Sequence, residues 1–163
     1  MSRSTKTNLK QSNNDNPFYD LRKMVFSLNV GTLGLEVVKS GISLCTVMEW
    51  EISGSVATLV SVIDGSTSLY LSTGGGIIGG GGHQNVVEAS SAFREASEKY
   101  LSRMKKDSDF KLPENGHVCF YVVTTDGVYK YDGLEKDMVS QRDEFSQLFF
   151  LGQNTITELR KIV

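Results

Sequence analysis

The sequence predicts an α/β (α+β) fold in a single domain, with helices packed on a mainly antiparallel sheet of about five strands in the order α-β-β-β-α-β-β-α. Two segments, 56–63 and 118–123, carry apolar residues on both faces, which is typical of strands covered on both sides. Two Asp-Gly pairs, at 64–65 and 126–127, favour tight hairpins and therefore antiparallel neighbours. Elsewhere, apolar residues recur at helical spacing, which predicts the helices.

The first half of the chain is predicted to form one helix and three strands. An asparagine followed by a proline, at 16–17, can cap and start a helix, and apolar spacing then extends this helix over 17–29. In 47–52 apolar and polar residues alternate, so we expect a half-exposed strand with Glu49 and Glu51 on its solvated face. The other two strands are expected over 56–63 and 68–72.

The second half is predicted to form a helix, two strands and a helical C-terminus. A capping box of Asn85 and Glu88 starts the helix, which runs to about Lys105. The C-terminal helical segment is expected to break at Gly152, and a second capping box at 155–158 would start its last part. The two strands are expected over 118–123 and 128–131, the latter at a sheet edge.

Length, charge and cysteine content limit which classes of protein this chain can belong to. The 163 residues allow one core, predicted over 17–163, after a polar, basic segment at 1–16 that is expected to be a flexible tail. A formal charge of −2 disfavours nucleic acid as a partner, and no apolar run reaches the roughly 18 residues of a membrane span. Cys45 and Cys119 lack the pairing of a disulfide framework or a zinc site. We therefore expect a cytoplasmic protein with no membrane partner and no cofactor.

A glycine-rich segment, Gly74–Gly82, is the strongest local feature, with seven of the 16 glycines in nine positions. Its main-chain N–H groups, followed by a helix N-terminus, could hold an anion such as a phosphate. The alternative is a packed turn that needs glycine for its backbone geometry, with Ile77 and Ile78 anchoring its tip or offered to a partner. The candidate ligand-binding residues are Ser72, Thr73, Gly74, Gly75, Gly76, Gly79, Gly80, His83 and Asn85.

Known nucleotide motifs do not fit this segment. A dinucleotide fingerprint would follow the first strand of a parallel unit, whereas the preceding strand here belongs to a hairpin. A Walker A loop would end in Gly-Lys-Ser/Thr, whereas this one ends in Gly82-His83-Gln84.

Catalytic and metal sites are also incomplete in the sequence. His83 could act as an acid or base, and Ser72 or Thr73 could be a nucleophile beside the glycine amides, but no further partner can be named. His117 and Cys119 share a strand face, and two ligands are too few for a metal site. We therefore predict no catalytic and no metal-binding residues.

Two resemblances add expectations about the fold. The segment Ser68–Gly81, with His83 after it and Leu148-Phe149 near the C-terminus, resembles a family of small uncharacterised bacterial proteins that carry an SLYxSTGGGxIGGG segment. This resemblance implies an ordered, soluble domain and supplies no mechanism. The element order also resembles roadblock and profilin-like domains, and no signature residue is matched, so no site residue is carried over.

These observations favour a non-enzymatic interaction or regulatory module, either a homo-oligomer or part of a complex with another protein. Its contact surface would be the glycine-rich segment and an exposed sheet edge. The alternative is a phosphate- or nucleotide-binding protein, with its small anionic ligand at Gly74–Gly82 and the following helix N-terminus.

Overall fold

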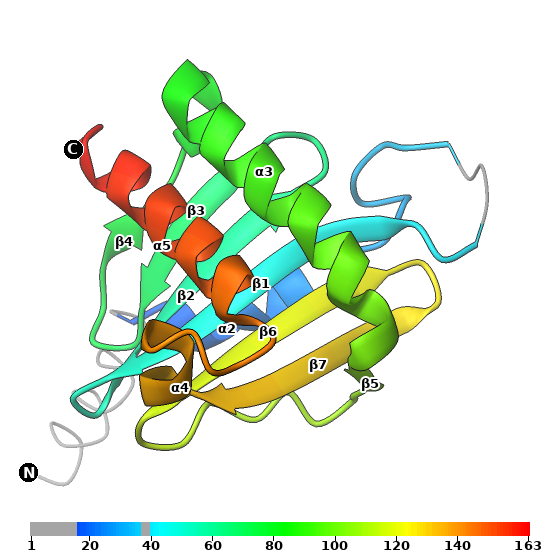
Figure 1. Ribbon diagram of the computed structural model, residues 1–163. Coiled ribbons are helices and arrows are strands. Elements are labelled where there is room, and N and C mark those ends of the chain that lie inside the picture. The colour runs from blue at the N-terminus through cyan, green and yellow to red at the C-terminus, as the bar shows by residue number, and fades with distance from the viewer. Residues whose placement is uncertain (1–15, 37–39) are drawn as a thin grey trace, which may run out of the picture.

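A computed structural model describes residues 16–36 and 40–163, and the predicted tail therefore lies outside the described residues except for Asn16. The described residues form an α+β fold with a single antiparallel sheet in the order β4-β3-β2-β1-β6-β7-β5 (Figure 1). Its strands are β1 (Ser43–Ile52), β2 (Ser55–Val62), β3 (Thr67–Leu71), β4 (Gly76–Ile77), β5 (Lys105–Lys106), β6 (His117–Thr124) and β7 (Gly127–Leu134). The helices are α2 (Phe18–Phe26), α3 (Gln84–Tyr100), α4 (Glu135–Val139) and α5 (Ser146–Arg160), with 3-10 turns η1 (Gly80–Gly82) and η2 (Leu101–Arg103).

The sheet has seven strands in the described residues, where about five were expected. The two additional strands, β4 and β5, have two residues each and form the two edges of the sheet. A two-residue strand has no alternation to detect, so the sequence pattern could not predict either one. The helix predicted to run to about Lys105 ends earlier. Helix α3 ends at Tyr100, and Lys105 belongs to β5, which is too short to be recognised from alternation.

Both faces of the sheet are covered. Helices α3 and α5 lie side by side on one face, and the shorter α2 lies behind the other (Figure 1). On the α3/α5 face, Met48 and Leu59 pack in one core cluster with Phe93. A second cluster lies under α2. Its fully buried strand residues are Cys45, Val47, Cys119 and Tyr121. None of the helices in the described parts of the chain is long and apolar enough to span a membrane.

The predicted solvated face of β1 is buried instead. Strand β1 lies in the middle of the sheet, paired with β2 and β6, and Glu49 has no exposed surface. The Arg22 guanidinium on α2 donates to both Glu49 carboxylate oxygens, at 2.8 and 2.7 Å, and Thr58 Oγ1 donates at 2.6 Å. A buried carboxylate needs such partners. Glu51 is also buried, and it accepts the main-chain N–H groups of two glycines.

The predicted helix break at Gly152 was wrong, because α5 is continuous from Ser146 to Arg160. Gly152 is the point at which α5 approaches the sheet, and a Cβ atom there would lie 2.6 Å from Met48 Sδ. The predicted capping box at 155–158 does not form either, since Thr155 lies inside the helix and donates to the Leu151 carbonyl at 2.9 Å. Gly152 therefore serves helix–sheet packing.

Candidate functional site

The glycine-rich segment leads from β3 to α3 by way of a tight turn, β4 and η1. Gly74 and Gly75 have φ values of 102° and 82°, a region that favours glycine. The turn is closed by two main-chain hydrogen bonds, from Leu71 N–H to the Gly75 carbonyl at 3.1 Å and from Gly74 N–H to the Leu71 carbonyl at 2.9 Å. The first part of the segment is therefore an ordered hairpin.

Two further glycines in this segment have no room for a side chain. A Cβ atom on Gly76 would overlap the main-chain carbonyl of Leu69 in the neighbouring strand. A Cβ atom on Gly80 would lie 2.7 Å from a methyl group of Leu159 and 2.9 Å from the Thr67 carbonyl. Gly80 thus lets η1 pack closely against both α5 and β3. These contacts give the glycines the backbone role described by the packed-turn alternative.

The two isoleucines at the tip of the segment differ in exposure. Ile77 is half-buried and packs against the core of the α3/α5 face, whereas Ile78 is 69% exposed. Gly79, which follows Ile78, adopts the left-handed region with φ of 88°. An apolar side chain is therefore directed to solvent between glycines that determine the path of the chain.

The candidate nucleophile and base do not meet as a catalytic pair in the described residues. The Ser72 hydroxyl accepts the Val56 N–H at 2.7 Å, and the Ser72 carbonyl accepts the Asn16 side-chain amide at 2.8 Å. Ser72 thus ties the end of β3 to β2 and to the start of α2. Thr73 and His83 are exposed, and no hydrogen bond links either of them to Ser72 among the described residues.

A carboxylate of the chain itself, that of Glu158 on α5, lies at the amino end of α3. The predicted capping box was wrong, because α3 starts at Gln84 and the Asn85 amide donates to Glu158 Oε2 on α5 at 2.8 Å. The Asn85 hydrogen bond, with Lys161 beside it, holds the pKa of Glu158 below its ordinary value. A negative charge therefore already lies near the N–H groups that a bound anion would use.

The second candidate pair, His117 and Cys119, lies on β6. His117 Nδ1 is 2.6 Å from Asp132 Oδ1 on β7, while Cys119 is fully buried under α2. Burial raises the pKa of the Cys119 thiol to about 12, which keeps it protonated and unreactive. Within residues 16–36 and 40–163, no group of three or more His, Cys, Asp or Glu side chains could hold a metal ion.

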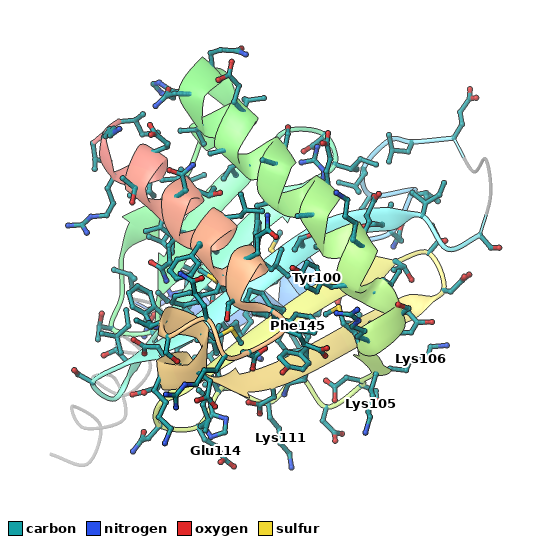
Figure 2. The ribbon with its side chains drawn as sticks, viewed as in Figure 1. Tyr100, Lys105, Lys106, Lys111, Glu114 and Phe145 are labelled. Carbon is teal, nitrogen blue, oxygen red and sulfur yellow. The ribbon has the colours of Figure 1, made fainter. Side chains whose placement is uncertain are left out.

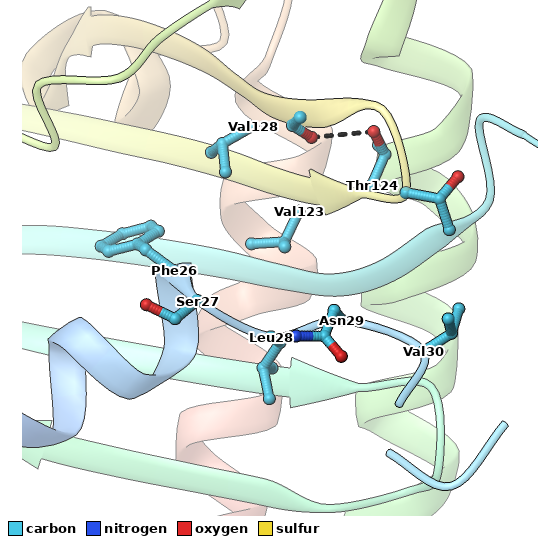
Figure 3. A pocket seen from close by; sticks show the side chains of 10 residues that line it. Phe26, Ser27, Leu28, Asn29, Val30, Val123, Thr124 and Val128 are labelled. Carbon is cyan, nitrogen blue, oxygen red and sulfur yellow. Dashed lines mark hydrogen bonds between the residues drawn. The ribbon is translucent and has the colours of Figure 1, made fainter. Parts of the chain in front are cut away.

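Two of the surface hollows of the described residues lie away from this segment. One, of about 280 Å³, lies between the chain that follows α2 and the β6–β7 hairpin (Figure 3). Its apolar lining residues are Phe26, Leu28, Val30, Val123 and Val128. The other, of about 480 Å³, lies at the β5 edge and is lined by Arg103, Lys105, Lys106 and Lys130.

The sequence reasoning missed this second hollow. Its signal was the cationic run at 103–106, which the periodicity assigned to the end of a helix. Lys130 comes from the predicted edge strand, and only the sheet pairing brings it beside Lys105.

Comparisons of the chain with protein-family models, with curated proteins and with solved structures found no match. The resemblance to a bacterial family and to roadblock and profilin-like domains therefore stays a prediction.

Proposed function

We propose that this protein is a non-enzymatic interaction module that binds a protein partner or a second copy of itself through the glycine-rich segment and the adjoining β4 edge. The observation that carries the proposal is Ile78, which is 69% exposed in a segment that Gly76 and Gly80 hold closely against β3 and α5. Apolar side chains held in place before binding are typical anchors of protein interfaces, because little conformational entropy is lost when they are buried.

The backbone on both sides of Ile78 supports this role. On one side, the Gly74–Gly75 turn is closed by hydrogen bonds and Gly76 lies against the Leu69 carbonyl. On the other side, Gly80 is inserted beneath α5. Each of these contacts restricts the path of the chain, so the exposed isoleucine is presented in a defined position.

The sheet edge next to Ile78 offers a second element of recognition. Strand β4 is the first strand of the sheet and pairs with β3 over two residue pairs, Leu69 with Ile77 and Tyr70 with Gly76. Edge strands with unpaired N–H and C=O groups accept extended segments of other chains. An anchor residue beside such an edge suits a protein contact better than a small-molecule pocket.

The experiment compares Ile78→Asp with Val139→Asp. Both positions are exposed, at 69% and 55%, and Val139 lies in α4, so the two variants introduce the same charge in place of an exposed β-branched apolar side chain. Sedimentation velocity would measure self-association, and a photo-crosslinking amino acid at exposed Gln84 would capture a protein partner in cells. We expect Ile78→Asp to abolish the self-association or the cross-link and Val139→Asp to preserve it.

Two results would refute the proposal. One is that Ile78→Asp forms the same complexes as the wild type while its circular dichroism shows that it is folded. The other is a specific turnover that His83→Ala or Ser72→Ala abolishes, because this would make the protein an enzyme.

A small anionic ligand at the same segment is the second candidate. Gly79, Gly81, Gly82 and His83 are exposed, so an anion could approach the amino end of α3. Thermal unfolding with inorganic phosphate and nucleotides tests this candidate. Suitable variants are His83→Ala and Gly82→Ala, because His83 is exposed and a Cβ atom at Gly82 would meet no other atom within 4 Å. A ligand-induced rise in Tm that both variants reduce would favour it over the interaction module.

A further inference from the structure

The opposite edge of the sheet carries a cationic hollow that the proposed function does not use. It measures about 480 Å³ and lies where η2 leads into β5. Four cationic residues line it, Arg103, Lys105, Lys106 and Lys130, together with the acidic residues Asp107 and Asp132. Figure 2 shows Lys105 and Lys106 next to each other at this edge, with their side chains directed away from the body of the molecule.

The positive charges in this hollow outnumber the negative ones, with four cationic residues against Asp107 and Asp132. Lys105 on β5 is the direct register partner of Lys130 on β7, and two like charges in that position repel each other. The ion pairs found among the described residues include neither of these lysines nor Lys106. Arg103 has one partner, Glu144 at 3.3 Å, and both side chains are about half exposed. A negatively charged ligand would relieve this repulsion.

Two of the lysine side chains in the hollow contact neighbouring parts of the protein. The Lys130 ammonium lies 5.2 Å from the centre of the Tyr121 ring and 3.4 Å from the Lys111 carbonyl. The Lys106 stem passes over Gly127, where a Cβ atom would lie 2.7 Å from its Cε. Both ammonium groups are therefore partly positioned before any ligand binds.

The main chain of β7 faces the same hollow. Asp107 N–H donates to the Val128 carbonyl at 2.8 Å, so Val128 directs its polar groups to the outer side of the sheet. Alternate residues of a strand share this direction, which places the N–H and C=O of Lys130 and Asp132 on the outer side too. Strand β5 pairs with β7 only at Tyr129 and Lys130. The outer edge of β7 thus continues past β5 at Asp132, two residues beyond Lys130, and Asp132 lines the same hollow as Arg103.

We infer that this edge binds an extended acidic segment of a partner protein, which adds a strand to β7 beyond β5. The segment's main chain pairs with Asp132, and its carboxylates meet Lys105, Lys106 and Arg103. The positively charged hollow and the open strand edge together specify this occupant. A compact phosphate or a nucleic acid would use the charges without pairing with the strand edge, and the net charge of −2 further disfavours nucleic acid. The inference is independent of Ile78 and the glycine-rich segment.

The test measures fluorescence anisotropy of a labelled peptide of alternating Glu and Thr, seven residues long, with the full-length protein. The variant is Lys105→Glu with Lys106→Glu, and the matched control is Lys23→Glu with Lys136→Glu, which changes two exposed lysines outside the hollow by the same charge. We expect the first variant to weaken binding at least tenfold and the control less than threefold. Circular dichroism checks that both variants fold.

Two further probes separate the parts of the inference. A peptide of the same charge with N-methyl groups at alternate residues cannot pair with β7, and we expect it to bind at least tenfold more weakly. A Lys-Thr peptide should not bind. The inference is overturned if the Glu-Thr peptide does not bind at millimolar protein, if Lys105→Glu with Lys106→Glu leaves its affinity unchanged, or if the N-methylated peptide binds equally well. Tighter binding of inorganic phosphate or a DNA duplex at the same lysines would overturn it as well.

Discussion

Replacing Arg22 with methionine should strongly destabilise the protein, because it leaves the buried carboxylate of Glu49 without its ion-pair partner. Glu49 has no exposed surface, and the Arg22 side chain is 11% exposed, so water can replace little of the lost interaction. Of the three hydrogen bonds to this carboxylate, the two from the guanidinium disappear, and only the bond from Thr58 remains.

The magnitude follows from this burial. Removing one partner of a buried ion pair costs about 3–5 kcal/mol, whereas an exposed pair is worth about 0–1 kcal/mol. For a domain of this size, a loss of 1 kcal/mol lowers Tm by about 2–4 °C, so we expect Arg22→Met to lower Tm by roughly 6–20 °C. Replacing both partners by apolar residues, Arg22→Met with Glu49→Leu, removes the unpaired charge and should recover most of the free energy of unfolding.

The assay is urea unfolding followed by the fluorescence of Trp50, the single tryptophan, which packs on the α3/α5 face and reports global unfolding. Thiol labelling of Cys45 and Cys119, which lie beneath α2, reports whether α2 separates from the sheet first. The reasoning is refuted if Arg22→Met costs less than 1 kcal/mol while both thiols stay protected. It is also refuted if Glu49→Leu lowers the free energy of unfolding by the same amount in Arg22→Met as in the wild type. The two residues would then not interact.

Three other predictions follow from burial and hydrogen bonding. Burial raises the pKa of both Cys45 and Cys119 to about 12, so iodoacetamide at pH 8 should modify neither thiol in the folded protein and both in urea, as counted by mass spectrometry. Gly152→Ala should lower the free energy of unfolding by up to about 2 kcal/mol, since crowding against the sheet costs about 1–3 kcal/mol and alanine contributes only roughly 1 kcal/mol to a helix; a more stable variant would contradict the packing role. Two main-chain N–H groups donate to Glu51 and lower its pKa, so its stabilising effect is present above about pH 4.3 and is lost as the pH falls through the lower folded-state value. The urea midpoint of Glu51→Gln should therefore change less than that of the wild type between about pH 5 and 3, and parallel curves would show that this carboxylate is not involved.

The sequence alone was sufficient for features that depend on neighbours along the chain. The apolar segment at 56–63 and the Asp-Gly pair at 64–65 predicted β2 and the hairpin after it, and 118–123 with 126–127 did the same for β6 and β7. The apolar spacing after residue 85 predicted α3. Strand alternation, turn chemistry and helical periodicity are local properties, so a single sequence carries them.

The tertiary structure decided what depends on residues far apart in the chain. Glu49 looks like a solvated strand residue until α2 places Arg22 over it, and Gly152 looks like a helix break until Met48 is found against it. The cationic edge needs β5 to pair with β7, which brings Lys105 and Lys130 together. Burial and charge proximity are set by which elements pack on which, and the local pattern of a sequence does not contain that information.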